Sequence, residues 1–475
     1  MLRLCLALLL VGLITAGASA QLDVTKLAEA HKAYDMARNE GKGNSENPNS
    51  GALGWGEGGI INAYAQMWEV TEDTYWLTKI SQHFDNIMGT AADPDGDGYL
   101  SWTTKGYSTA VAYAERLHNV SDAEITPDVQ INRNGKAAAE CIGHKYLIDF
   151  HKGPAQFRIL DWDTQELLVD DLEYQDGAAI TQIVPFKLVI SGQPHQGDRF
   201  MIRTFAPEEV EYVVHQGMFI YPVAKFIEAV KQRPELQEQF GADADEFLAF
   251  INKHVFEHNE QDWIEMGERG GAYREQAVFT CRSPNVILPH NQYGALARAW
   301  IVLKDVEGAH PLMADRAEKM ARYFHSYLEL DEESNAYKWR YMDWILYGEP
   351  KTSGYEDISH GHIDVSLAVE AARRGVVFTE QDMVRLANTW LKVMWNQDED
   401  EPLMASRVDG SEPFKHSALL VSWSELAQWD TKVYDLGLKT FLAKSEEQQA
   451  RWAPAMLLCA KRAGVVLAGM VAEGP

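Results

Sequence analysis

Two kinds of helical segment alternate along most of this chain, and this alternation limits the possible fold more than any other feature. Segments that are apolar on nearly every side are each followed by a segment with one apolar stripe: 60–70 by 74–88, 213–230 by 243–258, 293–303 by 311–328, and 363–372 by 380–395. A helix that is apolar all round is buried all round, whereas a striped helix faces water on its other side. The pattern predicts a mainly α protein, an (α/α) barrel or toroid with inner and outer helices.

Two further stretches extend this pattern. We expect one more helical hairpin from residues 107–118, and another from 416 through 441 to a closing helix at 446–467. The toroid would then contain about six or seven helical hairpins. Its predicted limits are residues 21–142 and 205–475.

One region interrupts the helices. Residues 143–204 contain β-like runs at 146–150, 156–160, 166–169 and 186–190, separated by Gly, Pro and Asp turns. They predict a small β-rich subdomain inserted into the helical host. Its last part, 192–202, loosely resembles β modules inserted in flagellar hook-associated proteins, a resemblance that concerns the fold only.

The first twenty residues have the features of a secretory signal peptide. Arg3 is followed by an apolar run over 4–14 and by small residues at 18–20. We expect cleavage after Ala20 and a secreted or periplasmic bacterial protein. No later stretch has the roughly 18 apolar residues of a membrane span, and the spacing of Cys141, Cys281 and Cys459 fits no zinc site.

The composition is acidic and rich in apolar residues. There are 70 Asp and Glu against 43 Lys and Arg, a net charge of -27, and 46% of the residues are hydrophobic. This apolar content excludes an intrinsically disordered chain. The acidic excess excludes a nucleic-acid binder, because phosphate contacts need clustered Lys and Arg. Any polyanionic ligand would need a local basic pocket.

Polar or glycine-rich clusters stand at the start of the predicted inner helices. Because the inner helices of an (α/α) barrel run parallel, their N-terminal ends line one mouth, and helix N-termini favour anionic ligands. We therefore expect the clusters to converge there. Their candidate residues are Trp55, Glu57, His215, His290, Asn291, His360 and His362.

The loop before the third of these helices is rich in arginine. Arg269, Arg274 and Arg282 lie close together in the sequence, with Tyr273 and Asn285 beside them. They form either the basic pocket or a solvated network with Glu265, Glu268 and Glu275. His, Tyr, Asn and Arg without a carboxylate pair suit β-elimination of a uronate polysaccharide: Arg, Asn or His neutralises the carboxylate, and Tyr or His moves the protons. A neighbouring Arg lowers the pKa of a Tyr, which makes Tyr273 a candidate base.

The order of these motifs resembles that of α/α-barrel uronate lyases. The motifs are 54–57, 215–218, the Arg/Tyr loop, 289–292 and 355–362, and the likeness covers about residues 50–120 and 205–400. It is greatest to polysaccharide lyase family 38 and more distant to the helical domain of glucuronyl C5-epimerases. The resemblance implies endo-acting cleavage of glucuronan or alginate (polymannuronate), with His215 and Tyr273 as base and acid and Arg269 or Arg274 on the carboxylate.

The predicted site contains residues beyond this base, acid and arginine. His290, Asn291 and His360 complete the predicted catalytic set, and the predicted substrate-binding residues are Trp55, Glu57, Arg282, Asn285, His362 and Trp339. The expected partner is an anionic polysaccharide, with no nucleic acid, membrane or required cofactor. The alternatives are a glycoside hydrolase that uses Glu57 with Asp357 or Glu356, a C5-epimerase, and a non-catalytic glycan-binding protein. Asp93, Asp95 and Asp97 begin a calcium-like loop, but its twelfth position is Thr104 instead of the expected Glu.

Overall fold

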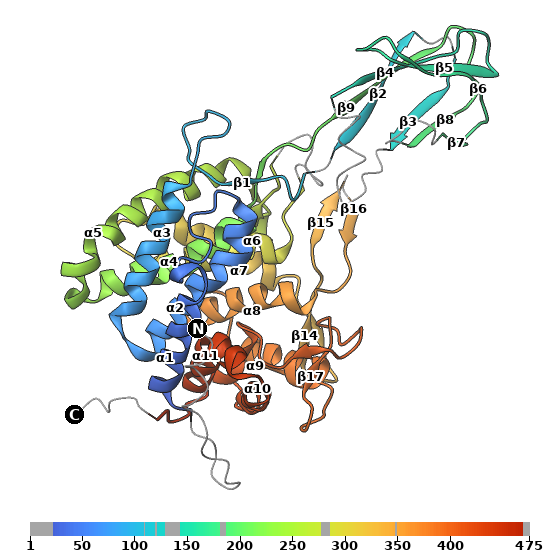
Figure 1. Ribbon diagram of the computed structural model, residues 1–475. Coiled ribbons are helices and arrows are strands. Elements are labelled where there is room, and N and C mark those ends of the chain that lie inside the picture. Colours follow the sequence, from blue (N-terminus) through green and yellow to red (C-terminus); the bar gives the residue numbers. More distant parts are fainter. Residues whose placement is uncertain are drawn as a thin grey trace, which may run out of the picture.

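A computed structural model describes residues 22–108, 110–118, 121–128, 143–180, 187–276, 286–346 and 349–468. The predicted signal peptide at 1–20 lies outside these residues. Figure 1 shows a ring of helices with a separate group of strands beside it. No helix in the described ranges has both the length and the apolar character that crossing a membrane requires.

The predicted (α/α) toroid is confirmed. Within the described residues, six inner segments are each backed by an outer helix. The inner segments are α2 (Gly58–Thr71), α4 (Val213–Gln232), α6 (His290–Leu303), α8 (Ile358–Arg373), the short 3-10 helix η8 (Trp423–Gln428) and α11 (Glu446–Arg462). The outer helices are, in the same order, α3 (Thr74–Gly89), α5 (Pro234–Phe250), α7 (Met313–His325), α9 (Glu380–Asn388), α10 (Lys432–Leu442) and α1 (Val24–Met36).

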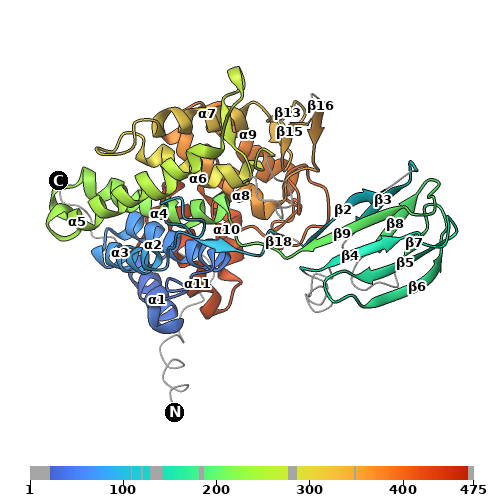
Figure 2. The same ribbon diagram turned by 90° about the horizontal axis from the view of Figure 1, so that it is seen from above.

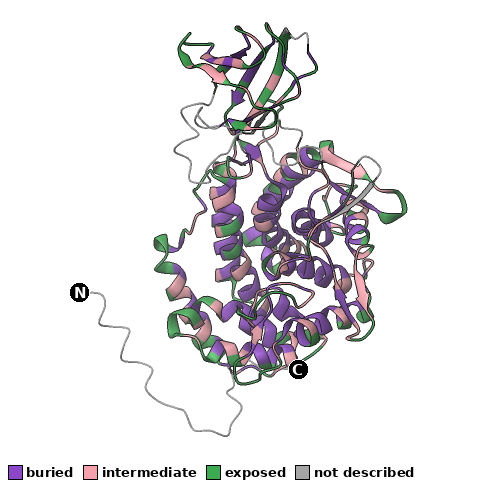
Figure 3. Ribbon diagram, turned by 90° about the vertical axis from the view of Figure 1, so that its right-hand side faces the viewer, coloured by how far each residue is buried: buried purple, intermediate pink, exposed green. Residues whose placement is uncertain are grey.

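Burial explains why these helices take their places. Every residue of α6 is buried, as its all-round apolarity predicts, whereas α7 buries only the stripe Met313, Ala317, Met320, Ala321, Tyr323 and Phe324. Figure 3 shows the buried residues gathered on the inner ring. Short π-helical turns, η2 (Ala52–Glu57), η4 (Ile251–Glu257) and η7 (Thr389–Met394), adjoin α2, α5 and α9.

Glycines let the inner helices approach closely. A Cβ on Gly217 of α4 would lie 2.4 Å from the carbonyl carbon of Ala295 in α6, and one on Gly54 would lie 2.6 Å from the Cα of His215. Real side chains do not tolerate such distances, so only glycine fits at these positions. The close approach draws the starts of η2, α4 and α6 together.

The opposite end of the ring, where the inner helices finish, is filled by a buried ion network. Lys225 contacts Glu370 at 3.0 Å, and the hydroxyl of Tyr221 donates to the same carboxylate at 2.6 Å. Arg374 pairs with both Glu370 and Glu228. This network, with the Arg373–Glu425 pair at 2.8 Å beside it, closes the floor of the barrel. The starts of the inner helices form its mouth.

The first and last helices close the ring. The amide of Val24 donates to the carbonyl of Ala468 at 3.0 Å, and the amide of Ala468 donates to Leu22 at 3.1 Å. Further along, His31 of α1 contacts the carbonyl of Ala450 in α11 at 3.0 Å.

The β-rich region is a sandwich of two antiparallel sheets, which Figure 2 shows to one side of the helical ring. One sheet has the order β2-β9-β4-β5-β6 and the other β3-β8-β7. The strands are β2 (Val111–His118), β3 (Glu124–Asp128), β4 (Lys145–Asp149), β5 (Gln156–Asp161), β6 (Leu167–Glu173), β7 (Ala179–Ile180), β8 (Lys187–Ser191) and β9 (Arg199–Phe205). Side chains such as Ile148, Phe157 and Phe200 fill its core.

The predicted runs at 146–150, 156–160, 166–169 and 186–190 correspond to β4, β5, β6 and β8, but the helical hairpin predicted at 107–118 is wrong. Residues 111–118 form β2, which pairs with β9 from Val111↔Phe205 to His118↔Arg199. The strands therefore begin well before residue 143. Two short strands, β1 (Thr103–Thr104) and β10 (Val210–Glu211), pair at the base of the sandwich, and β10 leads directly into α4. The sandwich is thus attached at the mouth of the barrel.

Shorter elements connect the helices. The hairpins are β11 (Trp263–Glu265) with β12 (Gly271–Tyr273), β13 (Glu329–Asp331) with β14 (Ala336–Lys338), β15 (Asp343–Leu346) with β16 (Glu349–Thr352), and β17 (Leu403–Met404) with β18 (His416–Ser417). Three 3-10 turns, η1 (Asn39–Gly41), η5 (Glu260–Asp262) and η6 (Gly267–Arg269), complete the described elements.

Candidate functional site

The starts of the inner helices converge at the mouth through a continuous series of side-chain contacts. Trp55 lies edge-on to His215, with ring centroids 5.4 Å apart, and its indole N–H donates to the hydroxyl of Tyr107 at 3.0 Å. The ring of Tyr107 stacks on Tyr212 at 3.9 Å and 9°. These residues join η2 to the start of α4.

The series continues to α6 and α8. The side-chain amide of Gln292 donates to the hydroxyls of Tyr212 at 2.8 Å and Tyr341 at 3.2 Å. The ring of Tyr341 then lies 5.4 Å from that of His360. Four elements that are far apart in the sequence therefore share one aromatic rim.

His215 is a buried neutral imidazole in this rim. Its Nδ1 contacts the hydroxyl of Ser50 at 3.0 Å, and its Nε2 is buried without a partner among the described residues. Burial lowers its pKa to about 4. His215 is therefore uncharged at neutral pH and has one ring nitrogen to offer.

Three charged or ionisable groups gather at the start of α8. Glu356, Asp357 and His360 each place one polar atom within 4.8 Å of the others. His360 Nδ1 lies 2.6 Å from Asp357 Oδ2 and 3.8 Å from Glu356 Oε1. Asp357 also caps the helix, since its Oδ1 accepts from the amides of Ser359 at 2.8 Å and His360 at 3.0 Å.

The two neighbouring carboxyl groups are driven to opposite charge states. Burial, together with the charges of Asp364 and Asp357, raises the pKa of Glu356 well above its ordinary value. Burial alone would raise the pKa of Asp357 too, but hydrogen bonds from His360 and Ser359 outweigh it and hold that pKa well below its usual range. The hydrogen bond to Asp357 raises the pKa of His360.

Asp364 lies behind Glu356 in the barrel wall. Its Oδ2 accepts the indole N–H of Trp339 at 2.8 Å, and burial raises its pKa. Glu356 and Asp364 are both 0% exposed and hydrogen-bonded to each other, so the pair keeps a proton at neutral pH. Trp339, a predicted substrate-binding residue, is 0% exposed as well, and its ring is part of the core.

Arg269, Tyr273 and Arg274, the described candidates of the Arg/Tyr loop, have their partners outside this site. Tyr273 is 0% exposed, and its hydroxyl contacts Trp300 at 3.3 Å, near the end of α6 that is farther from the mouth. Burial and the charge of Glu260 raise its pKa, whereas a base needs a lowered one. Arg269 donates to Tyr327 at 2.8 Å and Arg274 pairs with Asp262 at 3.1 Å. Arg282 and Asn285 lie outside the described residues.

Other predicted residues have structural partners. His290 contacts the hydroxyl of Tyr293 at 2.6 Å and Asp343 at 3.2 Å, and its own side chain is buried. Glu57 is 0% exposed, pairs with His83 and accepts the amide of Asn44 at 2.6 Å. This removes Glu57 from the acid pair expected of a hydrolase, because its carboxylate is already used inside the wall.

Asn291 and His362 keep unused polar atoms. The Oδ1 of Asn291 and the Nδ1 of His362 are buried without a partner in the described part of the chain. Burial and the nearby Arg298 lower the pKa of His362 to about 3, so its ring is neutral.

The protein also contains a cavity of about 330 Å³ that no sequence motif indicated. It opens where α1, α2 and α11 meet and extends inward to Met218, Arg298 and His362. Arg38 and Arg451 also line it, from opposite ends of the chain. The sequence indicated this site only through the predicted closing helix. Because the last helix of a ring must lie beside the first, α11 had to meet α1 here.

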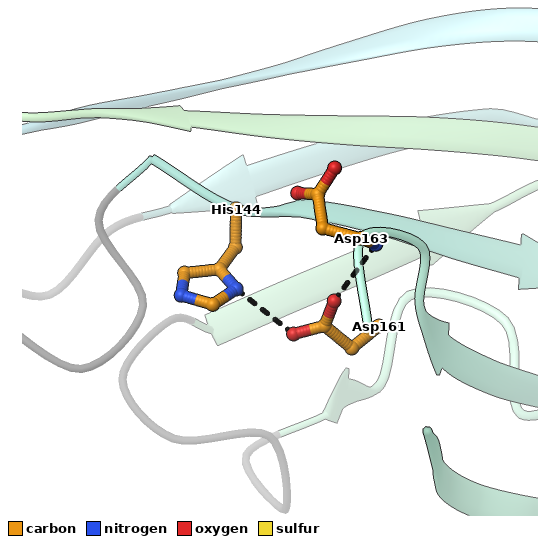
Figure 4. A group of neighbouring side chains, drawn as sticks. All are labelled: His144, Asp161 and Asp163. Atoms are coloured by element: carbon orange, nitrogen blue, oxygen red, sulfur yellow. Dashed lines mark hydrogen bonds and ion pairs between the residues drawn. The ribbon is translucent and has the colours of Figure 1, made fainter. Parts of the chain in front are cut away.

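Among the described residues, four groups of His, Asp and Glu could hold a metal ion, and in two of them the local turns use the carboxylates. Asp93, Asp95 and Asp97 gather as predicted, yet Asp93 accepts the amides of Gly96 at 2.7 Å and Gly98 at 3.1 Å. Calcium binding there stays a prediction. In the sandwich, Figure 4 shows His144 facing Asp161 at 2.9 Å, while the other oxygen of Asp161 accepts the amide of Asp163, also at 2.9 Å.

Comparisons with known proteins give only distant likenesses. No protein-family model matches the chain, and no curated protein does. Among solved structures, an inactive variant of an α-1,6-mannanase of Salegentibacter, in complex with α-1,6-mannotriose, is 11% identical over 93% of this chain and 99% of that chain, with a TM-score of 0.43. FlgL of Xanthomonas campestris is 14% identical over 43% of this chain and 78% of that chain, with a TM-score of 0.16.

The flagellar junction protein FlgL from Legionella pneumophila is 12% identical over 48% of this chain and 85% of that chain, with a TM-score of 0.18. With TM-scores below 0.5, these likenesses carry no weight for the function of this chain. The predicted lyase class is wrong, because the burial of Tyr273 removes the proton carrier that it required.

Proposed function

We propose that this chain is a glycoside hydrolase that cleaves a polysaccharide at the mouth of the barrel. The observation that supports this most is the pair of consecutive carboxyl groups Glu356 and Asp357, one protonated and one ionised, beside His360. Hydrolysis of a glycosidic bond needs such a division: one group protonates the departing oxygen, and an ionised carboxylate attacks the sugar or activates water.

The roles follow from exposure. The side chains of Asp357 and His360 are 32% and 38% exposed, so both can touch a substrate. Asp357 is the ionised carboxylate at the anomeric carbon. Protonated His360 donates to the departing oxygen, and the buried Glu356, 3.8 Å away, restores that proton. The proton that the attacking water gives to Asp357 then returns to Glu356 through His360. The glycosidic C–O bond breaks and the elements of water are added across it.

The rim supplies binding surface for sugars. Trp55 is 44% exposed, and the rings of Tyr107 and Tyr341 lie between it and His360 in the contact series. Aromatic faces that remain partly open stack well on pyranose rings, because both surfaces are flat and weakly polar. The orphan Nε2 of His215 offers a hydrogen bond to a sugar hydroxyl.

A reducing-end assay on a panel of neutral and acidic polysaccharides tests the proposal. We expect new reducing ends without the ultraviolet absorbance of an unsaturated sugar. Asp357→Asn should lower kcat by at least about 10²-fold, since it removes the charged group from the reacting centre. Glu307→Gln, which changes an exposed carboxylate in the turn after α6, is the matched control and should leave kcat unchanged.

His360→Asn separates this role from a structural one. Because His360 must be protonated and the hydrogen bond to Asp357 raises its pKa above the ordinary value, wild-type kcat should fall as the pH rises through this raised pKa. The variant should lose this alkaline limb as well as most of its activity. Reducing ends from none of the polymers, or full activity of Asp357→Asn, would contradict the proposal.

A further inference from the structure

The cavity between α1, α2 and α11 carries a charge pattern opposite to that of the whole protein. Three arginines line it: Arg38 and Arg451 are exposed at the surface, and Arg298 is 3% exposed at the inner end. Within the described residues, no carboxylate lies within 4.0 Å of any of the three guanidinium groups. Asp35, the acid that lines the cavity, is already engaged by Lys79 at 3.3 Å and by the hydroxyl of Tyr64 at 2.6 Å.

Arg298 is the most informative of the three. Its guanidinium donates to the carbonyl of Ala295 at 3.2 Å, the hydroxyl of Ser366 at 3.3 Å and the sulfur of Met218 at 3.1 Å, all neutral acceptors. Burial lowers its pKa to about 10, and carboxylates act on it only from a distance. A buried cation without a close anion is unfavourable, so a bound anion would stabilise it directly.

The cavity also offers unpaired ring nitrogens to hydroxyl groups of a ligand and aromatic surface to a sugar ring. His31 is 5% exposed, and its Nε2 is buried without a partner, as is the Nδ1 of His362; both residues line the cavity. Trp55 and Trp452 provide aromatic surface on its walls. A Cβ on Gly59 would meet nothing within 4 Å, which leaves open space beside α2.

The size fits one small ligand. A volume of about 330 Å³ stands at the lower end of the range for small-molecule sites. Trp55 lines this cavity and also contacts His215 in the rim, so one side chain borders both the cavity and the mouth.

We propose that this cavity binds an anionic sugar residue, a pyranose that carries a carboxylate or a sulfate, with Arg38, Arg298 and Arg451 around the acidic group. The proposal rests on the proposed function in one respect, since it makes the cavity a subsite for the substrate of the mouth. The acidic chain can thus select an acidic polymer, because the attraction is confined to a pocket with three uncompensated positive charges.

Binding to the inactive Asp357→Asn protein tests this inference apart from catalysis. Calorimetric titration with glucuronate, glucose 6-sulfate, glucose and inorganic sulfate at low ionic strength should show the two acidic sugars binding at least about 10-fold more tightly than glucose. The quenching of tryptophan fluorescence should accompany their binding, since two tryptophans line the cavity. The difference should shrink as salt is added.

The double variant Arg38→Gln/Arg451→Gln should weaken binding of the acidic sugars by at least about 10-fold and leave that of glucose unchanged. Both arginines are exposed, so the fold should survive, which circular dichroism would check. Arg322→Gln on α7, which removes one exposed positive charge where the double variant removes two, is the control and should bind like the parent.

Three results would overturn the inference: equal affinity for glucose and the acidic sugars, unchanged affinity in the double variant, or inorganic sulfate binding as tightly as either sugar. The last result would assign the cavity to a free oxyanion. Failure of the hydrolase assay alone would leave these binding results intact, so the two proposals can fail separately.

Discussion

The indole N–H of Trp339 donates to Oδ2 of Asp364 at 2.8 Å, with both side chains wholly buried. This bond fixes the carboxyl group that shares a proton with Glu356. Trp339→Phe removes the donor, so the shared proton should be held more tightly. We expect a loss of about 1.5–3 kcal/mol in the free energy of unfolding and an alkaline shift of the pH–rate profile, measured by urea unfolding and by initial rates.

Trp423→Phe is the matched control for that change. Trp423 is equally buried, but its indole donates to the neutral carbonyl of Ile358 at 3.0 Å. It should lower stability without moving the pH–rate profile. Equal profiles for the two variants would show that the bond to Asp364 has no part in proton transfer.

Tyr273→Phe should leave kcat and KM unchanged. The hydroxyl of Tyr273 lies in the wall between Glu260 and Trp300, where it can touch no substrate. Its loss should cost about 1 kcal/mol of stability, the usual net value of one hydrogen bond. A large fall in kcat at unchanged stability would refute this location of the site.

Gly217→Ala should strongly destabilise the barrel. The added methyl group would lie 2.4 Å from the backbone of Ala295, so α4 and α6 would have to separate. We expect a loss of about 1–3 kcal/mol in urea unfolding. Gly59→Ala makes the same change in α2 where no atom lies within 4 Å, and it should gain about 0.5–1 kcal/mol from its helix propensity.

Glu370→Gln should weaken the floor of the barrel by about 3–5 kcal/mol, because it leaves the half-buried Lys225 and Arg374 without the anion that they share. Burial alone would raise the pKa of Glu370, but Lys225 and Arg374 outweigh it and lower that pKa. The stabilising contribution is therefore complete above about pH 4.5 and is lost as the pH falls toward the lower folded-state pKa.

Urea unfolding from pH 7 to pH 3 measures this dependence, which should be shallower in the variant than in the parent. Glu318→Gln breaks an exposed pair with Arg322 and should cost less than about 1 kcal/mol at any pH. A similar loss in both variants would mean that the network at the floor is no stronger than a surface ion pair.

The inner helices could be predicted because a helix that is buried on all sides is apolar along its whole sequence. The whole of α6 is buried, and the sequence of that segment is apolar throughout. The error at 111–118 has an equally direct cause: its Ala, Glu, Arg and Leu favour a helix locally. Pairing with β9, more than eighty residues away, overrides that preference.

The side chains of the site were harder to predict than the helices that hold them. Periodicity places His215 and His360 at the starts of inner helices, and there they lie. Periodicity does not tell which way a loop faces. The basic pocket expected around Tyr273 is therefore not formed by Arg269 and Arg274, which contact Tyr327 and Asp262 instead. Arg38 and Arg451 belong to α1 and α11 and meet only through ring closure, which no local motif records.

That closure also governs how the protein comes into existence. The amide of Val24 must find the carbonyl of Ala468, a partner made more than four hundred residues later. Until the ribosome has released α11, α1 has no neighbour on one side, and the arginine-lined cavity has only part of its wall. In each newly made molecule this pocket can therefore be completed only after α11 has been made.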